Sequence, residues 1–213
     1  MFNGIYNGTI IIAEAKVWSP RGERLTQNSW EQQIESAGKV GRMVSVLTHP
    51  IWRRSPDDIK KARKILPSEI KILAKGFYET DDEVQRAVDD GADFVLVVGR
   101  RPKVHLERCF LEPLTLAELA DIPVSLWAVW NSRDLSSLKD LPGIPQFLLE
   151  RWKQMDGCSD RKRESFKEAR AIRLGPLCQA SNLKTVADIE PGANAVLVGS
   201  HLESFAASLG ITI

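Results

Sequence analysis

The chain has 213 residues, 43% of them apolar, and a formal net charge of +1. A chain of this length and apolar content can bury one sizeable core. The near-neutral charge gives no support to a polyanion-binding surface, and no long basic run with interleaved aromatic residues is present. We therefore expect no nucleic-acid partner.

The cysteines and the N-terminal residues indicate the compartment. Cys109, Cys158 and Cys178 are far apart and odd in number, which does not suggest a disulfide framework or a zinc site and favours a reduced compartment. The first residues lack the basic start and long apolar stretch of a signal peptide. No apolar run is long enough to span a membrane. We expect a cytoplasmic protein without a membrane partner.

In the first half of the chain, short apolar runs alternate with helical patterns. Strands are expected at 9–15, 43–47, 70–75 and 94–98 because these runs are short, apolar and rich in β-branched residues. Helices are expected at 30–40, from Ser55 toward Pro67, and from Thr80 to Gly91. Both of the latter two begin with a cap residue and acids in the first turn, which favour a helix start.

The second half continues the alternation. Strands are expected at 108–112, 124–130 and 193–198, with a weaker strand within 171–180, and helices at 115–120, at both ends of 148–169 and at 202–209. Alternating strands and helices indicate parallel βαβ units. About eight strands are what a closed barrel requires. We therefore predict an α/β protein, a (β/α)8 TIM barrel forming a single domain over residues 1–213. A doubly wound open sheet is the alternative.

Glu14 and Lys16 come where the first long strand runs out into Ser19-Pro20. Residues two apart in a strand point to the same face. In a barrel both would point into the mouth at the C-terminal ends of the strands, where barrel enzymes keep their catalytic groups. The alternative is an ordinary ion pair on an edge strand.

Other apolar strands also end in polar residues, which are Lys75, Glu112, Asn131, Ser181 and the pair Gly199-Ser200. Each has an ordinary alternative. Lys75 could be a lysine snorkelling from a strand end, Glu112 could cap the following helix, and Asn131 with Arg133 could be turn residues. In a closed barrel the C-terminal ends of all these strands lie at one mouth. Polar residues at so many strand ends therefore indicate an active site there.

Gly199 and Ser200 lie at a junction between a strand and a helix. They could simply cap that helix. Such a junction also offers backbone donors and a positive helix end to a phosphate, and barrels often bind phosphate near their last two strands. The sequence thus predicts a phosphate-binding candidate here.

Several segments, in order along nearly the whole chain, resemble one family. They are Ile-Ile-Ala-Glu-Ala-Lys at 11–16 with Ser19-Pro20, Ser-Val-Leu-Thr at 45–48, Ile-Leu-Ala-Lys-Gly-Phe at 72–77, Gly-Ala-Asp-Phe-Val-Leu at 91–96, Asn-Ser-Arg-Asp-Leu at 131–135 and Gly-Ala-Asn-Ala-Val-Leu-Val-Gly-Ser at 192–200. Together they resemble indole-3-glycerol phosphate synthase. The first and the Asn-Ser-Arg-Asp-Leu motif are fairly specific, whereas the glycine-containing motifs are shared by many phosphate-binding barrels.

The resemblance implies a carboxy-lyase of tryptophan biosynthesis. Such an enzyme closes the indole ring of 1-(2-carboxyphenylamino)-1-deoxyribulose 5-phosphate with loss of CO2 and water, and it needs no metal or organic cofactor. Lys75 matches the general acid, Glu14 and Glu112 match the carboxylates that serve as base and charge stabiliser, and Lys16 matches the lysine that contacts the carboxylate and phosphate side of the substrate. These residue types suit a reaction with several proton transfers.

The same resemblance implies the binding residues. The substrate-binding positions are Asn131, Ser181, Arg133 and Ser19, and the phosphate-binding positions are Gly199 and Ser200. The expected partner is a small phosphorylated aromatic molecule, and the oligomeric state is left open.

The chain also departs from the family pattern. The family's helical segment before the first strand is expected to be absent or replaced, and 180–182 read Ala-Ser-Asn where the family has Glu-Ser-Gly. The loop 49–54 lacks the usual glycine. Trp18, Trp52, Trp127 and Trp130 add aromatic bulk near the expected mouth, either as core and rim packing or as ligand-stacking residues.

Three functions therefore compete. The first is indole-3-glycerol phosphate synthesis. The second is a related lyase or cyclase reaction on another aromatic substrate, with or without a phosphate, which the expected lack of the N-terminal cover, the altered seventh strand and the additional tryptophans favour. The third is a non-catalytic barrel that acts as a partner subunit, which the presence of both Lys75 and Glu112 argues against.

Overall fold

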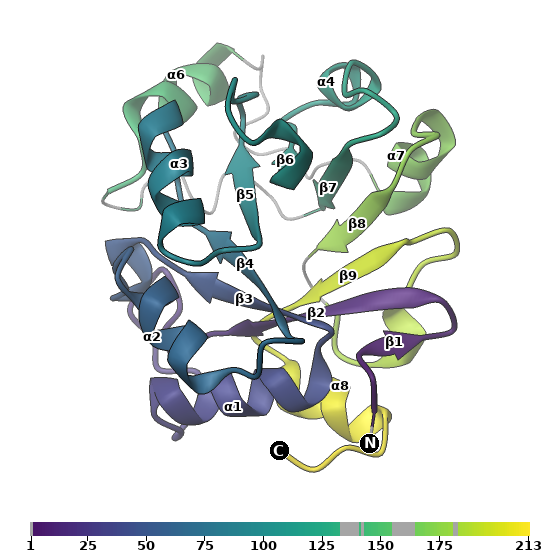
Figure 1. Ribbon diagram of the computed structural model, residues 1–213. Coiled ribbons are helices and arrows are strands. Elements are labelled where there is room, and N and C mark those ends of the chain that lie inside the picture. Colours follow the sequence, from purple (N-terminus) through teal and green to yellow (C-terminus); the bar gives the residue numbers. More distant parts are fainter. Residues whose placement is uncertain (1, 133–140, 142, 155–164, 181–182) are drawn as a thin grey trace.

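The computed structural model describes residues 2–132, 141, 143–154, 165–180 and 183–213. Within these residues, eight parallel strands close into a ring: β2 (Thr9–Ala15), β3 (Met43–Leu47), β4 (Lys71–Lys75), β5 (Phe94–Val98), β6 (Cys109–Glu112), β7 (Trp127–Asn131), β8 (Leu177–Ala180) and β9 (Ala195–Val198). Neighbours in the ring follow sequence order, and β9 pairs with β2 to close it (Figure 1). The expected (β/α)8 barrel is confirmed, and the open sheet is wrong.

The interior of the ring is filled by alternate residues of the strands, because successive side chains of a strand point to opposite faces. Ile12, Leu73, Leu96 and Val129 are fully buried members of this interior cluster. The register places Glu14 beside Ser45 and Leu47 beside Lys75. Polar residues at the C-terminal ends of β2 and β4 therefore continue the inward-facing rows of the core.

An aromatic layer packs the interior toward the N-terminal ends of β5, β6 and β7. The rings of Phe110 and Trp127 stack with centroids 4.8 Å apart, and Phe94 meets Phe110 edge to face at 5.5 Å. Phe110 belongs to the interior cluster, and the partly buried Phe94 and Trp127 pack against it. Trp127 is therefore a packing residue of the barrel floor and does not lie near the mouth.

Helices surround the ring, as Figure 1 shows: α1 (Trp30–Val40), α2 (Asp58–Ile65), α3 (Asp81–Asp89), α4 (Leu116–Ala120), α6 (Gln146–Gln154), α7 (Phe166–Ile172) and α8 (Leu202–Ser208). The cap expected at Thr80 is present, with the reciprocal bonds of a capping box to Glu83. The helix expected from Ser55 begins later, at Asp58, because the Asp58 carboxylate accepts a hydrogen bond from the Ser55 amide and holds the preceding residues in a turn.

The connections between strands are unequal. The β5–β6 connection, fully described, contains only the short 3-10 helix η2 (Leu106–Arg108), whereas α6 and α7 both fall between β7 and β8. The other 3-10 helices are η1 (Pro50–Trp52) and η3 (Val186–Asp188), and a short strand β1 (Ile5–Tyr6) pairs antiparallel with β2. No helix in the described part of the chain has the length and apolar character needed to cross a membrane.

Candidate active site

The centre of the site is the Glu14 carboxylate at the end of β2. The Lys75 ammonium, from the end of β4, lies 2.5 Å from Glu14 Oε2, and the Lys16 ammonium lies 3.9 Å from Oε1. Ser45 Oγ donates to Oε2 at 3.5 Å. Glu14 is only 2% exposed. A buried charge is stable only when it is paired and hydrogen-bonded, and these groups from three strands supply that pairing.

Gly199 follows β9 and touches the same carboxylate. A Cβ added at this position would lie 2.8 Å from Glu14 Oε1 and 3.4 Å from its carboxyl carbon, closer than van der Waals contact allows for the first. A residue without a side chain is therefore required for Glu14 to keep its place beside Lys75. Gly199 has a structural role here in addition to its expected role at a phosphate.

We expect Gly199→Ala to displace the Glu14 carboxylate and to lower turnover by about tenfold or more, because small displacements of catalytic groups have effects of that size. Steady-state kinetics measures the loss, and circular dichroism checks the fold. Ser68→Ala, at an exposed position before β4, is the control and should leave turnover unchanged. Turnover of wild-type size in Gly199→Ala would show that Glu14 need not be held against this glycine.

Glu112, at the end of β6, is 7% exposed. The amide of Asn131, at the end of β7, donates to Glu112 Oε1 at 3.2 Å. The helix-capping alternative for Glu112 is not what the structure shows, because Thr115 caps α4. Glu112 therefore faces inward at the C-terminal end of the barrel, joined to Asn131.

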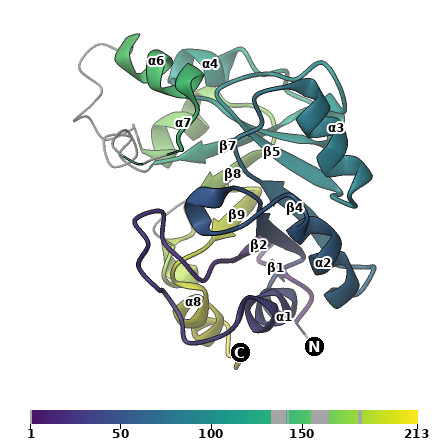
Figure 2. The ribbon, with the colours of Figure 1, turned by 90° about the vertical axis from the view of Figure 1, so that its left-hand side faces the viewer.

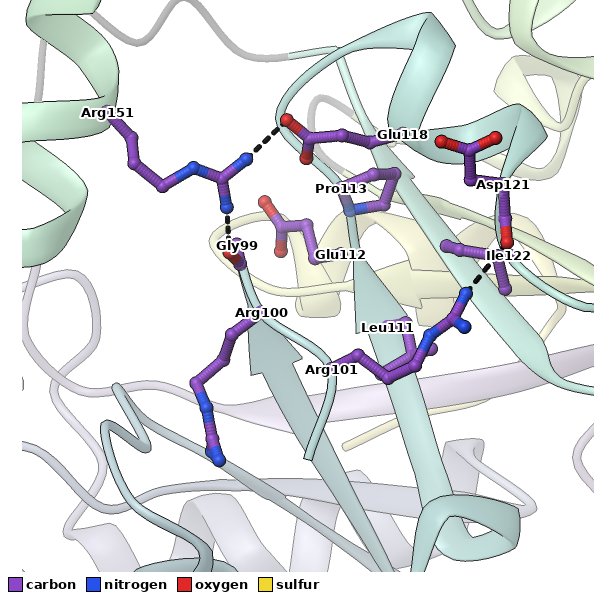
Figure 3. Close-up of a pocket in the computed structure, with 10 residues that line it drawn as sticks. All are labelled: Gly99, Arg100, Arg101, Leu111, Glu112, Pro113, Glu118, Asp121, Ile122 and Arg151. Atoms are coloured by element: carbon purple, nitrogen blue, oxygen red, sulfur yellow. Dashed lines mark hydrogen bonds and ion pairs between the residues drawn. The ribbon is translucent and has the colours of Figure 1, made fainter. Parts of the chain in front are cut away.

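One cavity at the mouth brings most of the expected residues together. Its lining includes Glu14, Lys16, Lys75, Asn131, Gly199 and Ser200. Its volume is about 80 Å³. Glu112 instead lines an adjoining cavity of about 200 Å³ beside Gly99 and Arg151, which Figure 3 shows. Asn131 connects the two, since it lines the first and is bonded to the carboxylate of the second.

A third hollow extends the mouth toward the start of α8. Lys16, Gly199, Ser200 and His201 line both this hollow and the first cavity. The Lys16 side chain thus lies between the Glu14–Lys75 pair and a hollow at the start of α8, which Glu203 also lines. Such a position suits an anion, since Lys16 brings a positive charge.

The remaining expected residues lie elsewhere. Ser19 bonds within its own loop, since its hydroxyl contacts the carboxylate of Glu23 and accepts from the Glu23 amide, and it is absent from the lining of the first cavity. Arg133 and Ser181 lie outside the described residues. Trp130 is fully buried in the layer between the strands and the helices, so it is a core residue.

The sequence placed Trp52 near the expected mouth, as a packing or a ligand-stacking residue, but did not predict the aromatic wall that it forms with Phe77. Trp52 lines the cavity and stacks on Phe77 with ring centroids 5.7 Å apart, and His49 meets both rings edge to face. Burial lowers the pKa of the His49 imidazole below its usual value, which favours the neutral ring. The available signal was the pair of aromatic residues at the exits of two neighbouring strands, which could equally have been rim packing.

This arrangement is that of a (β/α)8 barrel with paired lysines and carboxylates at the C-terminal ends of its strands, the face where barrel enzymes carry their catalytic groups. No family model matches the chain. It is 37% identical over 101 residues to the indole-3-glycerol phosphate synthase of Thermococcus kodakarensis, which covers 45% of this chain and 43% of that protein. It is 34% identical over 100 residues to the enzyme of the same name from Pyrococcus abyssi, covering 45% and 42%.

The chain is therefore similar to the indole-3-glycerol phosphate synthase family, in a divergent form, and the resemblance carried by the motifs is confirmed. The matched region spans less than half the length of each of these relatives.

Proposed function

We propose that this protein is an indole-3-glycerol phosphate synthase-like carboxy-lyase, which closes the indole ring of 1-(2-carboxyphenylamino)-1-deoxyribulose 5-phosphate with loss of CO2 and water. The observation that carries the proposal is the buried contact of 2.5 Å between Lys75 and Glu14 at the barrel mouth. The similarity to two enzymes of that name supports it. The substrate is a small molecule, and tryptophan biosynthesis would place the protein in the cytoplasm.

In the first step, the ring carbon that bears the carboxylate attacks the substrate carbonyl carbon. Lys75 donates a proton to the carbonyl oxygen, which becomes a hydroxyl. The bond to the carboxylate then breaks, CO2 leaves, and its electron pair restores the aromatic ring. An acid at the carbonyl oxygen is needed because the developing negative charge is otherwise unstable in a partly buried site.

In the second step, the hydroxyl leaves as water and the carbon next to it loses a proton. We assign the base to Glu112, which matches one of the two family carboxylates and accepts a hydrogen bond from Asn131 at the C-terminal end of the barrel. Glu14 is contacted by two ammonium groups and a hydroxyl, which suits a charge stabiliser better than a base. Asn131 orients Glu112, and Lys16 with Gly199 and Ser200 holds the phosphate.

A second function keeps the same acid and base but acts on a different aromatic substrate. The specific observation that favours it is the Trp52–Phe77 stack, of which Trp52 lines the first cavity and offers an aromatic face to a ligand ring.

The deciding experiment is to incubate the purified protein with the carboxyphenylamino substrate and to follow indole fluorescence. Formation of indole-3-glycerol phosphate with competitive inhibition by inorganic phosphate supports the first function. The second function holds instead if the phosphorylated substrate gives no fluorescent product but the protein cyclises the dephosphorylated substrate or another arylamino ketone.

A further inference from the structure

Helix α6 follows β7 in the sequence, yet it packs on the ends of other strands. Leu148 of α6 and Ile144 just before it form a buried cluster with Leu114, which follows β6. Val98, at the end of β5, packs against the same cluster. The helix therefore lies over the C-terminal ends of β5 and β6, on the face that carries the candidate active site.

Two features hold α6 in this place. The guanidinium of Arg151 donates to the carbonyl oxygen of Gly99 and pairs with the carboxylate of Glu118, as Figure 3 shows. Leu148 packs so closely that a Cβ added at Gly99 would lie 2.7 Å from its Cδ2 atom. Because Gly99 also has a φ of +69°, a conformation that favours glycine, both the backbone and the packing there require this residue.

The contact with Arg151 lies directly beside Glu112. Arg151 and Glu112 line the same cavity, and Figure 3 shows the Arg151 guanidinium on the side of Gly99 and Glu118. Glu118, the partner of Arg151, also accepts a hydrogen bond from the Leu114 amide, two residues after Glu112. Arg151 of α6 is therefore part of the boundary of the cavity that Glu112 lines.

Helix α6 also supports the aromatic wall of the first cavity. Ile51 and Phe77 pack against the cluster that contains Leu148, and Phe77 stacks on Trp52, which lines that cavity. The docked helix therefore helps to fix the Phe77 side of the Trp52–Phe77 wall.

We propose that α6 is a displaceable cover of the catalytic mouth, held down by Leu148 and Arg151, and that it lifts to admit the substrate. The identity of the substrate in this inference rests on the proposed function. The movement of the helix does not. Docked, the cover shields Glu112 from water, which strengthens the electrostatic interactions beneath it.

The test compares Arg151→Ala and Leu148→Ala with Glu150→Ala, whose side chain lies on the exposed face of the same helix. Hydrogen exchange of the amides of 146–154 measures docking. We expect about tenfold faster exchange in the first two variants and wild-type exchange in the third. Labelling of Glu112 with a carbodiimide and an amine, read by mass spectrometry of peptides, should be faster in the same two variants. If Leu148→Ala destabilises the whole barrel, the comparison of Arg151→Ala with Glu150→Ala still tests the proposal.

Binding is measured by stopped-flow fluorescence with the substrate analogue whose carbonyl is reduced to an alcohol, which cannot close the ring. We expect Arg151→Ala to bind it about threefold faster or more, because the open state is more populated. The proposal that α6 is a cover is wrong if hydrogen exchange is unchanged in both variants. It is also wrong if exchange becomes faster but Glu112 labelling and the association rate of the analogue stay the same. If the analogue binds to no form of the protein, the proposed substrate is wrong, and the exchange and labelling results alone decide the cover.

Discussion

Lys75→Ala should abolish turnover, with kcat reduced by about 10³-fold or more, because the group that protonates the carbonyl oxygen is removed. The Lys75 ammonium is also the closest partner of the buried Glu14 carboxylate. Its loss therefore removes both the acid and a close ammonium partner of Glu14, whereas the Lys16 ammonium lies 3.9 Å from that carboxylate. The KM should change less than kcat, because Lys75 acts mainly in the transition state.

The matched control for this variant is Lys71→Ala, which removes the same side chain from the other end of the same strand. Lys71 is exposed and pairs with Asp93, a surface contact of the kind that contributes about 1 kcal/mol or less. We expect near wild-type kinetics for Lys71→Ala. Circular dichroism and thermal unfolding establish that both variants are folded. Normal turnover in folded Lys75→Ala would exclude both enzymatic functions.

Glu112→Gln should lower kcat by about 10²- to 10⁴-fold, because an amide of the same shape cannot take up the proton released during dehydration. The glutamine oxygen can still accept the hydrogen bond that Asn131 donates at 3.2 Å, so the local packing is retained. Since ring closure and loss of CO2 precede this step, the variant should accumulate a decarboxylated, hydroxylated intermediate. Mass spectrometry of quenched single-turnover reactions would detect it.

Glu107→Gln is the control for this prediction. Glu107 is exposed in η2, just before the same strand, and its substitution should leave kcat unchanged. A further comparison separates the two carboxylates. If Glu14→Gln accumulates the intermediate and Glu112→Gln does not, then Glu14 is the base, and the assignment made from the partners of the two residues is reversed.

The barrel was predictable because the strands are short, apolar and separated by helical patterns, and each interior row depends only on the alternation of side chains. The bounds of β2, β3 and β5 agree with the sequence expectation. β7 begins at Trp127 rather than at 124, and β8 is confined to Leu177–Ala180, after Gly175 and Pro176, a pair that interrupts strand pairing. The sequence pattern shows which residues of a strand are apolar. It does not show at which residue the strand begins to form hydrogen bonds with its neighbour.

The site was predictable in part. Strand ends converge in a barrel, so Glu14, Lys16 and Lys75 could be placed together without knowledge of distances. The place of Glu112 in an adjoining cavity could not be foreseen, because it depends on the packing of α6, which follows a different strand. Long-range contacts such as that between Arg151 and Gly99, 52 positions apart, leave no periodic signal.

The aromatic layer of Phe94, Phe110 and Trp127 fills the interior of the barrel and so limits how a ligand can enter and leave the site. A barrel interior that is packed with side chains is no pore, so a molecule that enters at the mouth has to leave by the same route. The released product and the incoming reactant then compete for the same opening at the mouth of the barrel. Inhibition by the product should therefore be competitive with respect to the reactant.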